Sequence, residues 1–156
     1  MRSSTFEIRL DDLSHPATQA LVGLHLSGML AEVPAQHVTA FDPSAMKAAG
    51  LTVWSAWRGD AILGIGALHQ LDATSGEVKS MRTHPDHLRQ GVAVAILERI
   101  IAEARARGLR RLSLETGRTP AFDPSLALYR KRGFVDGEAF GAHEQSAFNQ
   151  FLHLWL

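Results

Sequence analysis

Residues 81–100 constrain the fold more than any other segment of the chain. They predict the end of a strand, a short polar turn, and a helix that is entered through Gly91. The helix extends over residues 91–107, because its apolar residues recur three and four positions apart and Gly108 follows it. The recurring apolar positions are Ala93, Ile96, Leu97, Ile100, Ile101 and Ala104.

The turn before this helix is a candidate anion site. Gly91 has no Cβ, so the oxygens of a ligand can approach the backbone closely there. The first turn of a helix leaves N–H groups unpaired and carries the positive end of the helix dipole. Phosphate is the usual occupant of such a site. Taken alone, the same residues also fit an ordinary helix start with a glycine near its cap.

Two common phosphate-binding motifs do not fit this turn. A nucleoside-triphosphate P-loop needs a Lys followed by Ser or Thr after its last glycine, and Val92 and Ala93 occupy those positions. A dinucleotide-binding fingerprint needs more glycines and a preceding parallel strand. Residues 51–83 instead predict three antiparallel strands joined by tight turns.

The order of predicted elements indicates an α/β (α+β) class. Gly64 and Gly66, inside one predicted strand, indicate a bulge or a close neighbour. In the first helix, Leu24 belongs to the predicted packing stripe. The predicted strands are residues 4–10, 51–57, 61–70, 77–83 and 110–115, a strand beginning at 134, and 149–156; the predicted helices are 16–32, 43–49, 91–107 and 123–132.

Composition narrows the class of protein and its partners. With 156 residues the chain is long enough for one domain with a hydrophobic core. Lys plus Arg and Asp plus Glu number 16 each, so we expect no nucleic-acid or membrane partner. No apolar run reaches the roughly 18 residues of a membrane span, and the N-terminus lacks the apolar core of a signal peptide, so we expect a cytoplasmic protein. The absence of cysteine excludes disulfides and thiolate chemistry.

A second motif lies at residues 129–134, Tyr-Arg-Lys-Arg-Gly-Phe. Together with Thr83-His84-Pro85 and with Leu-Arg-Gln-Gly-Val-Ala at residues 88–93, it resembles the GNAT family of acetyl-CoA-dependent N-acetyltransferases. In that family a Val-x-Pro-like turn leads into Arg/Gln-x-x-Gly-x-Gly/Ala, and a later helix carries Tyr-x-x-x-Gly-Phe. The similarity in element order covers nearly the whole chain, and the motifs cover residues 77–134.

The resemblance implies a GNAT-like fold over residues 1–156 as a single domain. Its sheet would be splayed, mixed and mostly antiparallel, with about seven strands and about four flanking helices. Two positions depart from the family pattern. Leu88 stands where the family commonly has Arg or Gln, and Phe122 stands where many members have an Asn that contacts the cofactor.

The resemblance also implies how acetyl-CoA binds. The backbone N–H groups of residues 89–93 would bind the pyrophosphate, helped by the helix dipole. Met81 and Thr83 would pair by backbone with the pantetheine arm, and an N–H there would polarise the acetyl carbonyl. The implied cofactor-binding residues are Met81, Arg82, Thr83, Arg89, Gln90, Gly91, Val92, Ala93, Phe122 and Tyr129.

The implied reaction is direct transfer of the acetyl group to an amine. Tyr129 would protonate the departing thiolate, although on this helix it could instead be a core aromatic residue. An amine with a pKa of about 10.4 is mostly protonated at neutral pH, so a base or a water relay is needed. Glu77 and Glu115 are the candidate bases, and either could equally be a surface strand residue.

The acceptor side of the site is less constrained. In the family, the first helix and the loop after it cover the acceptor, so His25 and His37 are candidate substrate residues; each could also be a solvent-facing or core histidine. His84 and His87 lack a third ligand, so no metal is expected. The acceptor would be a small-molecule amine. The alternatives are a protein lysine or N-terminus, or a non-catalytic acyl-CoA-binding regulatory domain, and a homodimer remains open.

Overall fold

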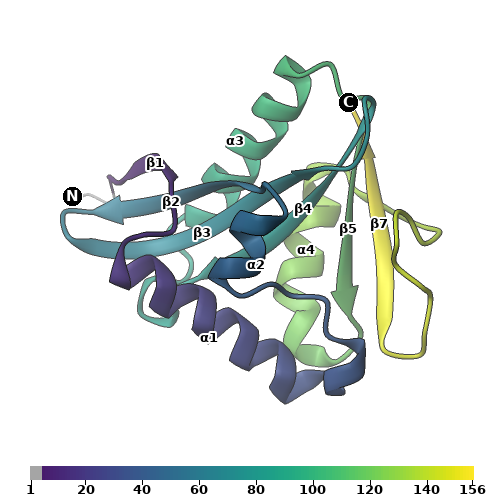
Figure 1. Ribbon diagram of the computed structural model, residues 1–156, viewed down its shortest axis with the longest axis horizontal. Coiled ribbons are helices and arrows are strands. Elements are labelled where there is room, and N and C mark those ends of the chain that lie inside the picture. Colours follow the sequence, from purple (N-terminus) through teal and green to yellow (C-terminus); the bar gives the residue numbers. More distant parts are fainter. Residues whose placement is uncertain (1–4) are drawn as a thin grey trace.

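A computed structural model of the protein describes residues 5–156. One mixed sheet runs through it in the strand order β1-β2-β3-β4-β5-β7-β6 (Figure 1). The strands are β1 (Glu7–Asp11), β2 (Thr52–Arg58), β3 (Ala61–Gln70), β4 (Ser75–Thr83), β5 (Arg111–Gly117), β6 (Val135–Gly137) and β7 (Asn149–Trp155). The helices are α1 (Pro16–Glu32), α2 (Pro43–Ala48), α3 (Val92–Ala106) and α4 (Asp123–Arg132), with short 3₁₀ turns η1 (Ala35–His37), η2 (Pro85–His87) and η3 (Pro120–Phe122).

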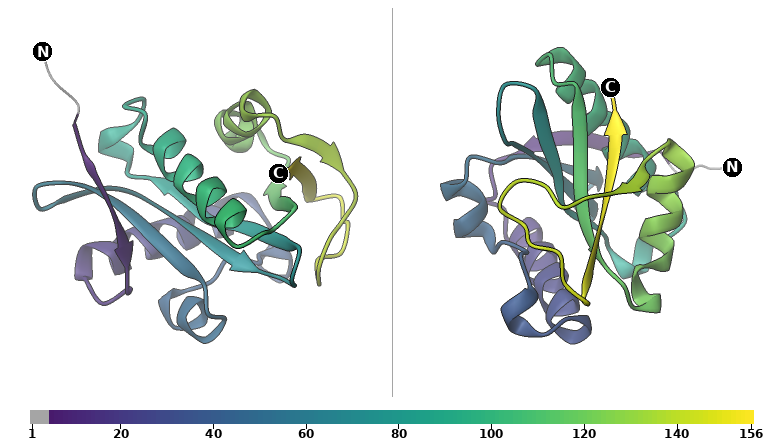
Figure 2. Two further views of the ribbon diagram at one scale, coloured as in Figure 1. Left: turned by 90° about the horizontal axis from the view of Figure 1, so that it is seen from above. Right: turned by 90° about the vertical axis from the view of Figure 1, so that its right-hand side faces the viewer.

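Helices cover both faces of the sheet. Figure 2 shows α3 and α4 on one face and α1 and α2 on the other. The stripe of α3 that was predicted from its periodicity is buried from Ile96 onward, with Ile96 and Ile100 packed over β2, β3 and β4. Ala93 is only partly buried, and Val92 is buried in its place. On the opposite face, Leu21 of α1 and Met46 of α2 pack in a second apolar cluster.

The sheet opens between β4 and β5, its only parallel pair among the described residues. These strands pair only from Ser75–Glu77 to Arg111–Ser113, although β4 continues to Thr83 and β5 to Gly117. The two strands diverge beyond that point, and α4 lies behind the gap (Figure 1). The predicted α/β class with a splayed, mostly antiparallel mixed sheet is therefore confirmed.

A bulge in β4 sets the direction of its side chains. Between Ile65 and Ala67 the register with β3 shifts, and Ser80 has a positive φ of 57°. A Cβ on Gly66 would lie 2.5 Å from the Met81 Sδ and 2.5 Å from Ile96 of α3, so only glycine fits there. The prediction of a close neighbour is confirmed at Gly66, and the predicted bulge is found in β3 beside Gly64, where the register with β2 shifts between Ala56 and Trp57. Met81 consequently faces α3, while the residues on either side of the bulge face α1 and α2.

Several predicted details are corrected by the structure. Leu24 is 42% exposed, so the prediction that it packs inward is wrong. The cause is the orientation of α1, whose inward face consists of Thr18, Leu21 and Val22 and of His25, which meets Arg82 of β4. Leu24 lies on a different side of the helix. β4 also begins two residues before the predicted Glu77, and the predicted residue 4 lies outside the described part of the chain.

Candidate active site

The N-terminal turn of α3 has the geometry that an anion site needs. Gly91 is the N-cap, with φ 81° and ψ 9°, and Arg89 just before it has a positive φ of 62°. A Cβ on Gly91 would meet no atom within 4 Å, so the space beyond this backbone is open. The side chain of Gln90 accepts a hydrogen bond from Arg58, at 3.0 Å, and does not cover the turn. Leu88 is 56% exposed, and it contributes no charge there.

Residues 78–83 of β4 form an open strand edge. They pair with β3 on one side, whereas the pairing with β5 ends at Glu77 on the other. The backbone of Met81, Arg82 and Thr83 therefore borders the gap. An extended ligand can add to such an edge through main-chain hydrogen bonds, as an extra strand would.

Tyr129 lies in the core on the α4 side of the gap. It is 5% exposed and packs edge-on against Phe134, with ring centroids 5.5 Å apart. Its hydroxyl makes no hydrogen bond within residues 5–156. The hydroxyl oxygen is not among the fully buried polar atoms without a partner, so it is not completely shielded from solvent. Burial raises the pKa of Tyr129 well above its ordinary value. The hydroxyl thus stays protonated at neutral pH and remains available as a donor to a ligand.

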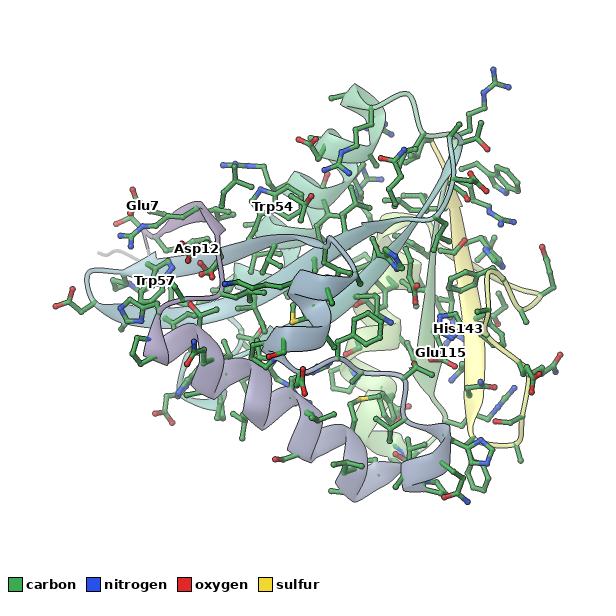
Figure 3. All side chains as sticks on the ribbon, in the orientation of Figure 1. Glu7, Asp12, Trp54, Trp57, Glu115 and His143 are labelled. Carbon is green, nitrogen blue, oxygen red and sulfur yellow. The ribbon has the colours of Figure 1, made fainter. Side chains whose placement is uncertain are left out.

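Glu77, in the last pair between β4 and β5, and Glu115, two residues beyond that pairing on β5, meet through one histidine. His143, in the loop between β6 and β7, lies with its Nε2 2.8 Å from the Glu77 Oε2. Its Nδ1 is 3.6 Å from the Glu115 Oε1, and Figure 3 labels these two residues. All three side chains are largely buried. We call Glu77, Glu115, His143 and Lys79 the Glu–His cluster.

Electrostatic coupling favours the charged forms of Glu77 and His143. Burial alone would raise the pKa of Glu77, but the hydrogen bond from His143 and the charges of Lys79, His143 and His69 lower it below the ordinary value. The hydrogen bond to Glu77 in turn raises the pKa of His143, against the effect of burial. The Nδ1 of His69, 3.8 Å from Glu77, is buried and has no hydrogen-bond partner in the described chain.

Polar residues that were not predicted complete the cluster. Lys79 lies 3.5 Å from Glu77, bonds the carbonyl of Thr39 at 3.3 Å and lies 4.5 Å from the ring centre of Phe41. Glu115 accepts hydrogen bonds from Thr39 and from Asn149. The alternation Glu77-x-Lys79 within a strand already places both side chains on one face, and this signal could have identified Lys79. Nothing local in the sequence indicated Asn149 or Thr39.

The remaining predicted residues lie elsewhere. His25 pairs with Arg82, whose Nε donates to its Nδ1 at 3.1 Å, and His37 stacks against Phe148 with centroids 4.7 Å apart. Within residues 5–156 neither histidine contacts Glu77 or Glu115. Phe122 packs against the end of β5, where a Cβ on Gly117 would clash with its ring. Phe122 is therefore a packing residue at the mouth of the gap.

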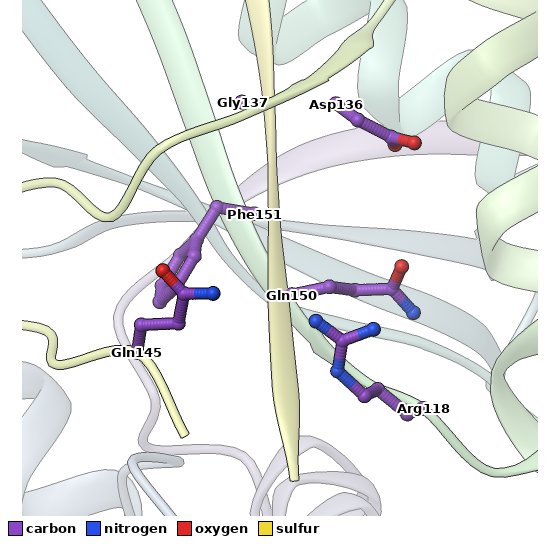
Figure 4. Close-up of a pocket in the computed structure, with 6 residues that line it drawn as sticks. All are labelled: Arg118, Asp136, Gly137, Gln145, Gln150 and Phe151. Atoms are coloured by element: carbon purple, nitrogen blue, oxygen red, sulfur yellow. The ribbon is translucent and has the colours of Figure 1, made fainter. Parts of the chain in front are cut away.

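A separate small pocket lies beside β7 (Figure 4). Its volume is about 140 Å³, which is smaller than the roughly 300 Å³ of the smallest typical ligand pockets. It is lined by Arg118, Asp136, Gly137, Gln145, Gln150 and Phe151. Within residues 5–156 no group of three or more His, Asp and Glu side chains is placed to bind a metal ion. No helix in that range is long and apolar enough to cross a membrane.

The fold is similar to that of solved acetyltransferases. A GNAT family acetyltransferase from Elizabethkingia anophelis, solved with acetyl-CoA bound, superposes with a TM-score of 0.68 over 99% of this chain and 100% of that one, at 16% sequence identity. This likeness establishes the same fold.

Sequence comparison identifies the family. Residues 18–134 match the Acetyltransferase (GNAT) family. The chain is 47% identical over 151 residues to the protein named Uncharacterized N-acetyltransferase YedL of Escherichia coli, covering 97% of this chain and 95% of YedL. It is 41% identical over 145 residues to Uncharacterized N-acetyltransferase YsnE of Bacillus subtilis, covering 93% of this chain and 96% of YsnE. The chain belongs to the GNAT acetyltransferase family and is an acetyl-CoA-dependent acyltransferase.

Proposed function

We propose that this protein transfers the acetyl group of acetyl-CoA directly to the amine of a small molecule, and that residues 1–156 act as one acetyltransferase domain. One observation carries the proposal. The open edge of β4 borders the gap between β4 and β5, and the N-terminal turn of α3 follows this strand in the chain. The Glu–His cluster lies where β4 and β5 separate. A cofactor, a leaving-group acid and a set of proton acceptors can thus serve one cleft.

The cofactor would bind along two backbone surfaces. The N–H groups at Arg89–Ala93 would receive the pyrophosphate, since Gly91 leaves room for its oxygens and the helix dipole favours negative charge. The pantetheine arm would lie along Met81, Arg82 and Thr83 as an added strand. An N–H of this edge would also stabilise negative charge on the acetyl oxygen as the amine attacks.

The transfer needs a proton donor for the departing thiolate. In the reaction the amine nitrogen bonds to the thioester carbon, the carbon–sulfur bond breaks, and the products are an amide and CoA. Tyr129 would hydrogen-bond to the sulfur as its charge develops, because its hydroxyl is protonated and has no hydrogen-bond partner among residues 5–156. Its raised pKa makes complete proton transfer unfavourable, so the main contribution is a hydrogen bond that strengthens in the transition state.

The Glu–His cluster would take the proton that the amine loses. Glu77 is the central member, with His143, Lys79 and His69 around it. Its lowered pKa makes it a weak base alone, and a proton that it accepts can pass to His143, 2.8 Å away, only while that imidazole is neutral. Glu115 is the second candidate base, 3.6 Å from the other imidazole nitrogen. The loop bearing His37 and the α1 helix bearing His25 would cover the acceptor.

Free CoA release in the presence of an amine panel tests the proposal. The purified protein is incubated with acetyl-CoA and single amines, and CoA thiol and acetylated product are both quantified. Product that equals CoA release supports transfer to a small molecule. Tight acetyl-CoA binding without release for any amine or peptide would favour the regulatory-domain alternative, and release only with peptides would favour a protein acceptor.

A further inference from the structure

The guanidinium of Arg82 has no acidic partner. Its Nε donates to the Nδ1 of His25 at 3.1 Å, and one terminal nitrogen reaches the His25 carbonyl at 3.4 Å. No carboxylate in residues 5–156 forms an ion pair with it, whereas Arg107, Arg130 and Arg132 each have one. Arg82 is half-buried, and a buried charge is costly without an opposite charge. An anion bound there would remove that cost.

The partner of Arg82 positions it without neutralising it. Burial, together with the positive charges of Arg82 and Lys79, lowers the pKa of His25 to about 4. The imidazole is therefore neutral at physiological pH and only accepts the hydrogen bond. One helical turn further, a Cβ on Gly28 would lie 2.6 Å from the Arg82 guanidinium, so α1 presents a glycine where the guanidinium rests. α1 thus fixes the direction of a charge that it leaves unpaired.

The phosphates of the cofactor are not the natural partner of this charge. The α3 N-terminal turn lies on the α3 face of the sheet, where Val92 comes within 2.7 Å of a Cβ placed on Gly64. Because of the bulge at Ser80, the Arg82 side chain points to the opposite face and meets α1. Lys79 and Glu77 face the same side, since Lys79 contacts the ring of Phe41. The anion therefore belongs to a second ligand on the acceptor side.

We propose that Arg82 binds a carboxylate of the acceptor, so that the substrates are amino acids or other amines that carry a carboxylate. This inference rests on the proposed acetyl transfer. Along β4 the acceptor face presents Glu77, then Lys79, then Arg82, which places carboxylates at one end and an unpaired guanidinium at the other. That charge order is complementary to a molecule with an ammonium group and a carboxylate. The planar guanidinium also suits a carboxylate better than a lysine would.

Matched substrate pairs test this assignment. We would measure kcat and KM for methionine, leucine and phenylalanine against 3-(methylthio)propylamine, isoamylamine and phenethylamine, which lack only the carboxylate. Arg82→Gln is expected to raise KM for the amino acids by about 10- to 100-fold, the value of a charge-assisted hydrogen-bond pair. KM for the plain amines and Kd for acetyl-CoA, which would meet only the backbone of residue 82, should change much less than KM for the amino acids. Arg82→Lys should recover only part of the loss.

A second pair of variants avoids removing the charge. Gly28→Ala pushes a methyl group against the guanidinium and should raise KM for the amino acids. Gly23→Ala lies on the same helix with no atom within 4 Å of its new Cβ, and it should change nothing. Both substitutions favour the helix, so a loss of folding cannot mimic the expected result.

The outcomes are distinguishable from failure of the proposed function. Plain amines acetylated as well as their amino-acid partners would overturn the inference. So would a loss of acetyl-CoA affinity in Arg82→Gln with the substrate preference unchanged, because Arg82 would then serve a cofactor phosphate. If no amine is acetylated, acetyl transfer fails, and titration of N-acetylmethionine into the CoA-loaded protein still decides the role of Arg82. Binding that Arg82→Gln abolishes supports the carboxylate site, and absence of binding to the unaltered protein overturns it.

Discussion

Replacing Gly91 with alanine should separate cofactor binding from stability. Gly91 has φ 81°, and Gly108 at the other end of the same helix has φ 79°. A Cβ at either glycine would meet no atom within 4 Å. Gly108→Ala is therefore a matched control, with the same backbone conformation and the same open surroundings, away from the proposed phosphate site.

Both variants should lose similar stability. An alanine in the left-handed region costs about 1–2 kcal/mol, and the reduced freedom of the unfolded chain returns about 0.4–1 kcal/mol. The net loss of about 1 kcal/mol corresponds to a fall in Tm of roughly 2–4 °C for a chain of this size. Thermal unfolding without ligand should show this fall in both variants.

Only Gly91→Ala should weaken acetyl-CoA binding. The new methyl group occupies the space through which phosphate oxygens would approach the backbone, and loss of one charge-assisted hydrogen bond costs about 1.5–3 kcal/mol. The Kd should rise by about 10- to 100-fold, measured by isothermal titration calorimetry with both variants. Equal Kd values for Gly91→Ala and the unaltered protein would refute the assignment of the phosphate site, and an equal loss in Gly108→Ala would show a general effect of stability.

Two further predictions concern the reacting groups. Tyr129→Phe should lower kcat at least about tenfold and change acetyl-CoA Kd by less than about twofold, because the lost hydroxyl makes no hydrogen bond within residues 5–156. Unchanged turnover in the thiol-release assay would exclude its role as donor. The second prediction concerns stability and pH. The pKa of His143 is higher in the folded than in the unfolded protein. Its contribution to the free energy of unfolding is therefore complete below the unfolded-state pKa of about 6.5 and declines as pH rises through the folded-state pKa. The pKa of His25 is lowered to about 4, so stability should instead decline as pH falls below about 6.5. Denaturant titrations should therefore show that His143→Gln flattens the alkaline limb of the stability profile and His25→Gln the acidic limb. Unaltered limbs in the two variants would contradict these assignments.

Local pattern was sufficient for much of the fold. The apolar spacing in α3 and the glycine after it predicted a helix that the structure places within one residue at each end. Gly64 and Gly66 predicted the close packing beneath α3, because a glycine inside a strand often marks a place where another segment approaches closely. These features depend on residues that are close together in the sequence, and for that reason they could be predicted from it.

Features that depend on segments far apart in the sequence could not be predicted. The left-handed conformation of Ser80 has no local signal, yet it decides that Arg82 faces α1. His143 lies in a loop without regular structure, and its contacts with Glu77 and Glu115 require strands that part and a hairpin that returns. The sequence named both glutamates as separate candidates, and only the folded chain joins them through one imidazole.

A crystal structure with CoA tests the central claim most directly. We predict the pyrophosphate at the N–H groups of Arg89–Ala93, the pantetheine arm hydrogen-bonded along residues 78–83 of β4, and the sulfur next to the Tyr129 hydroxyl. CoA bound elsewhere, with the open edge of β4 unoccupied, would contradict it.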